Sequence, residues 1–126
     1  MLKRLLPTAL LLTLALPAAA HGQAGLDCTR KVSDPDMQVL ECTFARDDFA
    51  TAYRALLQTL HPQTAQLPQE LPSGSRVYPA DDAHRYVKWA SADEVLVAEE
   101  NNSGSFAKAT LRRENGAIAV HWVKAD

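Results

Sequence analysis

Apolar and polar side chains alternate along much of the chain, and a period of two residues predicts β-strands with one buried face. Residues 27–32 and 37–44 are also strand-like, and polar turn formers separate them. In the C-terminal half, polar turn residues interrupt the alternation repeatedly. They divide this half into predicted antiparallel strands over residues 75–79, 85–90, 94–100, 105–113 and 117–124.

One helix is predicted between the two groups of strands. Asp47 or Asp48 is placed to cap its start, and Pro62 forces the chain out of the helix after about Leu60. Its apolar side chains share one face at helical spacing: Phe49, Tyr53, Leu56, Leu57 and Leu60. We expect this face to pack on the sheet, and the alternative is a stripe that fills a partner's groove.

Residues 62–74 form a long connection with three prolines and no regular apolar period. The simplest interpretation is a spacer that returns the chain to the sheet, with Leu67 and Leu71 at the surface. Loops of this length also gather binding residues. We therefore treat Leu67, Pro68 and Leu71 as candidate partner contacts.

The pair Asn115-Gly116 predicts a two-residue hairpin turn, because both positions of such a turn need a positive φ. The register that follows gives the last two strands a core face and an outer face. The core face holds the pairs Leu111–Val120 and Ala109–Trp122. The outer face holds Lys108, Thr110, Arg112 and His121.

A turn centred on Ser103-Gly104 adds a third strand to this meander. It places Glu99 opposite Lys108 and Leu96 opposite Leu111, so Glu99 joins the outer face. The polar outer face is then a candidate site for an anionic ligand or a protein partner. A solvated sheet surface is the alternative, since exposed charge pairs contribute only tenths of a kcal/mol to stability.

The two cysteines fall on the first two predicted strands. A hairpin centred on Pro35 places Cys28 directly opposite Cys42, at a separation that a disulfide can bridge. We therefore predict a Cys28–Cys42 disulfide. A redox-active pair is the alternative, but the C-x-x-C spacing that lowers the pKa of a catalytic thiol is absent.

Residues 1–20 have the pattern of a secretory signal peptide. Two basic residues precede an apolar run from Leu5 to Leu16, and Ala18 and Ala20 fit the A-x-A cleavage rule. Cleavage after Ala20 leaves a mature chain of residues 21–126, whereas cleavage after Ala24 is a second option. The apolar run is shorter than the roughly 20 residues that a membrane-spanning helix needs. We therefore expect no membrane span in the mature chain. The alternative is that residues 1–20 are retained as a membrane anchor. This predicts a periplasmic or secreted protein.

Removal of Lys3 and Arg4 leaves 11 basic and 15 acidic side chains, a mature net charge of −4. This balance argues against non-specific binding to nucleic acid, which depends on clustered basic residues. The length suits one domain with a core of its own. The predicted fold class is α+β: a disulfide-linked N-terminal hairpin, and one helix packed on an antiparallel sheet with a C-terminal meander.

His21 offers a metal-binding alternative, because cleavage after Ala20 would place its imidazole beside a free α-amino group. An N-terminal His-Gly resembles the start of some copper-dependent polysaccharide oxygenases and copper chaperones, a resemblance that covers two residues. It implies copper binding with a further imidazole from among His61, His84 and His121. The cluster Asp81, Asp82 and His84 is a second candidate for metal binding, although a polar turn is the simpler interpretation.

Nucleophile, zinc-protease and nucleotide-binding signatures are absent from the sequence. We therefore expect no cofactor and a non-catalytic protein that binds another protein of the cell envelope. An inhibitor or immunity-type protein for an envelope enzyme is the specific form of this hypothesis. The alternatives are a copper-binding protein that uses His21 and a small hydrolase that acts on the cell wall. The sequence does not determine the oligomeric state.

Overall fold

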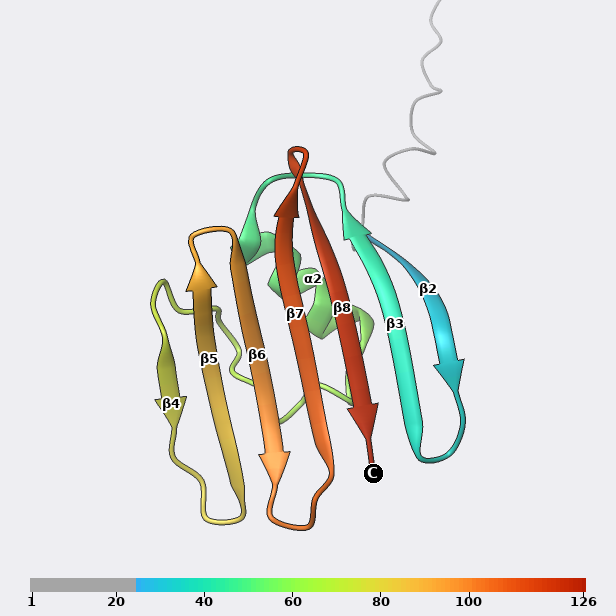
Figure 1. The fold of residues 1–126 in the computed structure, drawn as a ribbon, viewed down its shortest axis with the longest axis vertical. Helices are drawn as coiled ribbons and strands as arrows, with labels where there is room; N and C mark the ends of the chain where they lie inside the picture. Colours follow the sequence, from blue (N-terminus) through green and yellow to red (C-terminus); the bar gives the residue numbers. More distant parts are fainter. Residues whose placement is uncertain (1–24) are drawn as a thin grey trace, which may run out of the picture.

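Seven antiparallel strands and one helix are built from residues 25–126, which are the residues that the computed structural model describes (Figure 1). The elements are β2 (Leu26–Ser33), β3 (Met37–Phe44), α2 (Phe49–Thr59), β4 (Arg76–Tyr78), β5 (Ala83–Ser91), β6 (Glu94–Asn101), β7 (Phe106–Glu114) and β8 (Ala117–Ala125). Their order in the sheet is β2-β3-β8-β7-β6-β5-β4. The predicted α+β class is confirmed, whereas the signal over residues 1–20 and the candidate His21 lie outside the described residues.

The N-terminal hairpin turns on Asp34. Its carboxylate accepts hydrogen bonds of 2.8 Å from the backbone N–H groups of Asp36 and Met37, as Asp does when it initiates a turn. Cys28 lies opposite Cys42, and the predicted disulfide between them is confirmed. A bulge after Arg30 then shifts the register by one residue on the turn side of the hairpin.

The helix α2 begins as expected at an Asp48 cap. The Asp48 carboxylate accepts hydrogen bonds from the backbone N–H of Thr51 at 3.1 Å and from its hydroxyl at 2.7 Å. These bonds lower the pKa of Asp48. The residues that α2 buries against the sheet are Phe49, Ala52, Tyr53, Ala55 and Leu56, and Leu57 is half-buried beside them.

The connection after α2 is folded onto the same face of the sheet, which corrects the expectation that Leu67 lies at the surface. Leu67 is only 3% exposed. The buried Thr64 donates its hydroxyl to the Leu57 carbonyl at 3.2 Å, and the Trp89 indole donates to the Pro72 carbonyl at 3.0 Å. Tyr53 also donates its hydroxyl to the Pro68 carbonyl. The segment therefore extends the layer formed by α2.

The Asn115-Gly116 turn sets the register of β7 and β8 as predicted. Asn115 has φ of 53° and Gly116 has φ of 80°, the left-handed values that a type I′ turn requires. Leu111 lies opposite Val120, and Ala109 lies opposite Trp122. All four of these side chains are buried in the core.

The predicted register between β6 and β7 was wrong by one residue. Glu99 lies opposite Ala107, and Lys108 lies opposite Ala98. The turn is a three-residue loop closed by an Asn101 N–H bond to the Ser105 carbonyl at 2.8 Å, and Gly104 has a φ of 101°. Such a loop carries one more residue than the two-residue turn that we expected.

The shift reverses the faces of β6, because side chains alternate along a strand. Leu96 lies on the outer face, and Glu99 points to the core side, where it is 7% exposed and paired with Arg85 at 2.6 Å. Glu100 takes the place on the outer face that we expected for Glu99.

We predict that the disulfide contributes about 3 kcal/mol to the free energy of unfolding, because it closes a loop with a sequence separation of 14. The double variant Cys28→Ser and Cys42→Ser should lose this amount in urea unfolding. Reduction of the wild-type protein should give the same loss and reoxidation should restore it. A midpoint that does not change on reduction would contradict the prediction.

Candidate functional site

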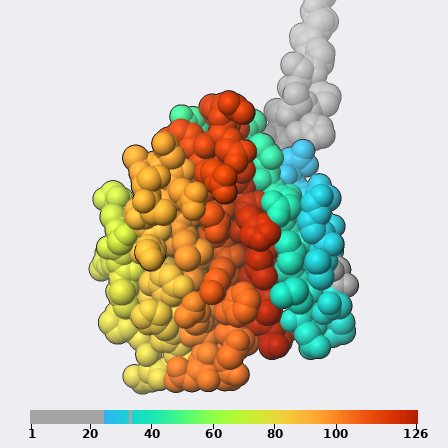
Figure 2. All heavy atoms as spheres, viewed as in Figure 1, coloured from blue at the N-terminus to red at the C-terminus, as the bar shows by residue number. Residues whose placement is uncertain are grey.

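One face of the sheet is left uncovered by any described segment, because α2 and the connection that follows it both lie on the opposite face (Figure 1). Figure 2 views this uncovered face with all its atoms. Alternate side chains of β3, β8, β7, β6 and β5 line it, in the registers that the ladders define. The uncovered face is therefore the surface on which the predicted polar residues Lys108, Arg112 and His121 lie.

A cluster of three polar side chains lies on this face near the β6–β7 turn. Glu100 accepts a hydrogen bond from the Tyr86 hydroxyl at 2.8 Å and pairs with the Lys108 ammonium at 3.1 Å. These residues belong to β5, β6 and β7 and surround Ala98, whose exposure is 0%. The small Ala98 side chain leaves room for its larger neighbours to meet above it.

The cluster changes the pKa values of two of its members. The hydrogen bond from Tyr86, followed by that from Lys108, lowers the pKa of Glu100. Burial and then the bond to Glu100 raise the pKa of Tyr86 to about 12. At neutral pH the cluster therefore presents a carboxylate, a neutral phenol and an ammonium group in defined positions.

A second polar group lies on the same face and extends from β3 to β6. The His121 imidazole contacts the Glu41 carboxylate across the β3–β8 ladder. Arg112 pairs with Glu94 at 3.3 Å and with Glu114 at 3.6 Å. Between these pairs lies a hollow of about 210 Å³, lined by Glu41, Thr110, Arg112, Glu114, Ala119, Val120 and His121. The predicted residues Arg112 and His121 therefore line the same hollow.

The predicted contacts Leu67, Pro68 and Leu71 lie on the opposite side of the sheet from Lys108, Arg112 and His121, so they do not form one site with them. Leu67 is buried, and Leu71 is half-buried against the core. The polar residues beside them remain exposed. This segment therefore offers a partner mainly its polar side chains, Gln66, Gln69 and Glu70.

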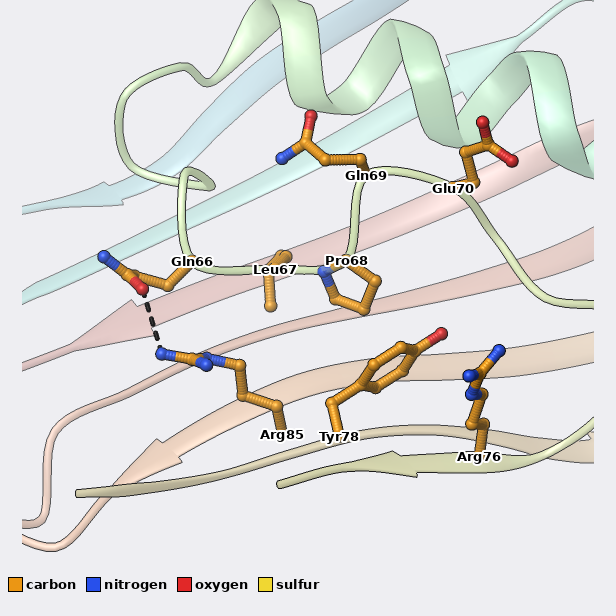
Figure 3. A pocket seen from close by; sticks show the side chains of 8 residues that line it. All are labelled: Gln66, Leu67, Pro68, Gln69, Glu70, Arg76, Tyr78 and Arg85. Atoms are coloured by element: carbon orange, nitrogen blue, oxygen red, sulfur yellow. Dashed lines mark hydrogen bonds between the residues drawn. The ribbon is translucent and has the colours of Figure 1, made fainter. Parts of the chain in front are cut away.

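A cleft of about 410 Å³ separates this connection from the edge of the sheet (Figure 3). Tyr78 and Arg85 rise from β4 and β5 toward the loop, and Arg85 donates to the Gln66 side chain at 2.9 Å. Arg85 also forms the ion pair with Glu99. The Arg76 guanidinium lies 5.3 Å from the centre of the Tyr78 ring.

Asp81 and Asp82 belong to the turn that precedes β5. Their carbonyl groups accept hydrogen bonds from Asn102, at 3.5 Å from its side chain and 3.0 Å from its backbone. His84 follows on β5, with its ring 5.0 Å from that of Tyr86. Within residues 25–126, no three His, Cys, Asp or Glu side chains converge as a metal site requires.

Sequence reasoning missed Glu100, because the register error placed Glu99 on the outer face. It missed Tyr86, because no turn in the sequence assigned a register to the strand over residues 85–90. The presence of Gly104 was the available signal, since a glycine at the last loop position favours the three-residue loop.

Comparisons with protein-family models, with curated proteins and with solved structures found no significant match to this chain. No helix in the described part of the chain has the length and apolar character needed to cross a membrane.

We predict that Glu100→Gln lowers the pKa of Tyr86 below about 12 without restoring its ordinary value, because burial is the larger cause of the shift. The folded-state pKa lies above the unfolded one, so the contribution of neutral Tyr86 to stability is lost as the pH rises from about 10 towards 12. Absorbance titration of the phenolate, with Tyr86→Phe to assign the signal, measures the shift. Glu94→Gln, on the same face, should leave this pKa unchanged, and an unchanged value in Glu100→Gln would refute the assignment.

Proposed function

We propose that this chain is an exported, non-catalytic protein that binds another protein of the cell envelope through the uncovered face of its sheet. The observation that carries the proposal is the one-sided layer, in which α2 and the following connection cover one face and leave the other available. The disulfide supports export, because disulfides persist in oxidising compartments.

The size of the uncovered face suits a protein partner. Its six longer strands have eight or nine residues each. At about 4.8 Å between strands and about 3.4 Å per residue, they span roughly 650 Å². Each partner in a standard protein interface contributes about 600 to 1,000 Å². One side of such an interface therefore fits on this face.

The polar chemistry of the face also supports specific recognition. Its ion pairs are exposed and contribute about 1 kcal/mol or less each to folding, so their main physical effect is to hold charged groups in position. Positioned charges steer association and select a partner of complementary charge. An envelope enzyme is the proposed partner, and occupation of its active site or substrate groove would inhibit it.

The test is capture of partners from a native periplasmic extract, with cross-linking at the face and mass spectrometry. The bait variant Lys108→Glu with Arg112→Glu reverses two charges on the uncovered face. Arg54→Glu reverses an exposed charge on α2, on the other side of the sheet, and serves as the matched control. We expect the captured partner to bind the face variant at least about tenfold more weakly, a change of about 1.4 kcal/mol, and the control as tightly as the wild-type protein.

An inhibitor must also slow its captured enzyme in a turnover assay, and the face variant should lose this effect in proportion to its affinity. Equal capture by the face variant, or loss of capture by Arg54→Glu alone, would contradict the proposed surface. Turnover of peptidoglycan by the purified protein itself would contradict the non-catalytic role and favour the cell-wall hydrolase.

A further inference from the structure

The strand β4 is an edge of the sheet, and it carries the most exposed of the large apolar side chains in the described residues. Val77 lies in the middle of β4 and is 60% exposed. An exposed edge strand presents unpaired backbone groups that another chain can use. Among the strands of residues 25–126, β4 pairs only with β5, so no described strand pairs with its other side.

The direction of the free backbone groups follows from the ladder between β4 and β5. The Trp89 N–H donates to the Ser75 hydroxyl at 2.9 Å and therefore points toward the β4 side. N–H directions alternate along a strand, so Arg85 and Val87 face β4 as well, opposite Tyr78 and Arg76. Val77 therefore directs its N–H and C=O groups away from the sheet.

Hollows lie on both faces of the sheet at this edge. The cleft of about 410 Å³ lies on the side of the loop, and a hollow of about 510 Å³ lies on the uncovered face. Arg76 borders both. Side chains of an added strand alternate between the two faces, so consecutive residues of that strand would enter the two hollows in turn.

The hollow on the uncovered face combines an apolar lining with a basic rim. Val77, Tyr86 and Leu96 contribute the apolar part, and His84 and Lys88 contribute the basic part. None of its described lining residues is acidic. Neither Arg76 nor Lys88 forms an ion pair with another described residue, and the Glu70 carboxylate in the loop-side cleft is turned away from Arg76 (Figure 3).

We propose that the β4 edge binds an extended acidic segment of a partner protein as an added strand, with one large apolar side chain of that segment beside Val77. The residues next to this side chain are acidic and meet Arg76 on the loop side, and acidic residues two positions away from it meet His84 and Lys88 on the uncovered face. Backbone pairing supplies alignment and the two hollows supply selectivity, as in other cases of strand addition. The proposal rests on the proposed function, because it describes how a protein partner attaches.

The edge limits the length of the added strand. β4 has three residues, and Pro79, just after it, lacks an N–H group. Only a short segment can pair, so side chains in the hollows must provide most of the affinity. This makes binding sensitive to the charge of the segment.

The test uses capped synthetic peptides and the full exported protein, observed by ¹H–¹⁵N NMR. The probe has a central Leu between Glu residues, and its control has Lys in place of every Glu. We expect the acidic peptide to shift resonances of β4 and of residues around the outer hollow, and to protect the Val77 amide from hydrogen exchange. The Lys peptide should bind at least about tenfold more weakly, or 1.4 kcal/mol.

Two variants separate the backbone contribution from the charge contribution. Val77→Pro removes the outward N–H and should weaken binding, whereas Val77→Thr keeps that group and similar bulk. Arg76→Gln with Lys88→Gln leaves the edge intact and should abolish the preference for the acidic peptide. This second variant keeps the test decisive if Val77→Pro does not fold.

Equal binding of the two peptides, or shifts confined to other strands, would overturn the proposal. A dimer that forms without peptide and dissociates on Val77→Pro would also overturn it, because a second copy would then take this edge. If the peptides fail while partner capture still depends on Lys108 and Arg112, the edge proposal fails and the proposed function stands.

Discussion

The pairing of β3 with β8 is the contact on which the rest of the structure depends. It joins the N-terminal hairpin to the C-terminal meander, with Leu40 opposite Trp122 in the core and Glu41 opposite His121 on the uncovered face. Residues about 80 positions apart in sequence thus become neighbours. Without this ladder the sheet would separate into two smaller parts, and no face as wide as an interface would remain.

Local signals account for the parts of the fold that the sequence predicted. The Asp48 cap, the Asn115-Gly116 turn and the two opposed cysteines each act within a short segment, and each is confirmed. The β6–β7 register failed because a two-residue turn and a three-residue turn have nearly the same local sequence, and one residue reverses a face. Leu67 is buried because the connection over residues 62–74 packs on the core. The apolar pattern of this segment has no period that would predict such packing.

In the candidate site, too, some residue positions follow from a local turn and others depend on the pairing of several strands. The outward positions of Lys108, Arg112 and His121 follow from one turn and were predictable. The Tyr86–Glu100–Lys108 cluster depends on three strands in register. The register of β6 against β7 was predicted wrongly and that of β5 was not predicted, so the cluster was missed. The uncovered face therefore holds its charges in pairs formed across strands, and these pairs position the groups that a partner would meet.

The most direct test of this account is the orientation of β6, because it decides which side chains the uncovered face presents. Methyl NMR with a soluble paramagnetic agent measures it. We expect fast relaxation of the Leu96 methyls, which lie on the uncovered face, and protection of the buried Val95 and Val97 methyls. Protected Leu96 methyls beside exposed Val95 and Val97 methyls would contradict the register, and the polar cluster and the binding face with it.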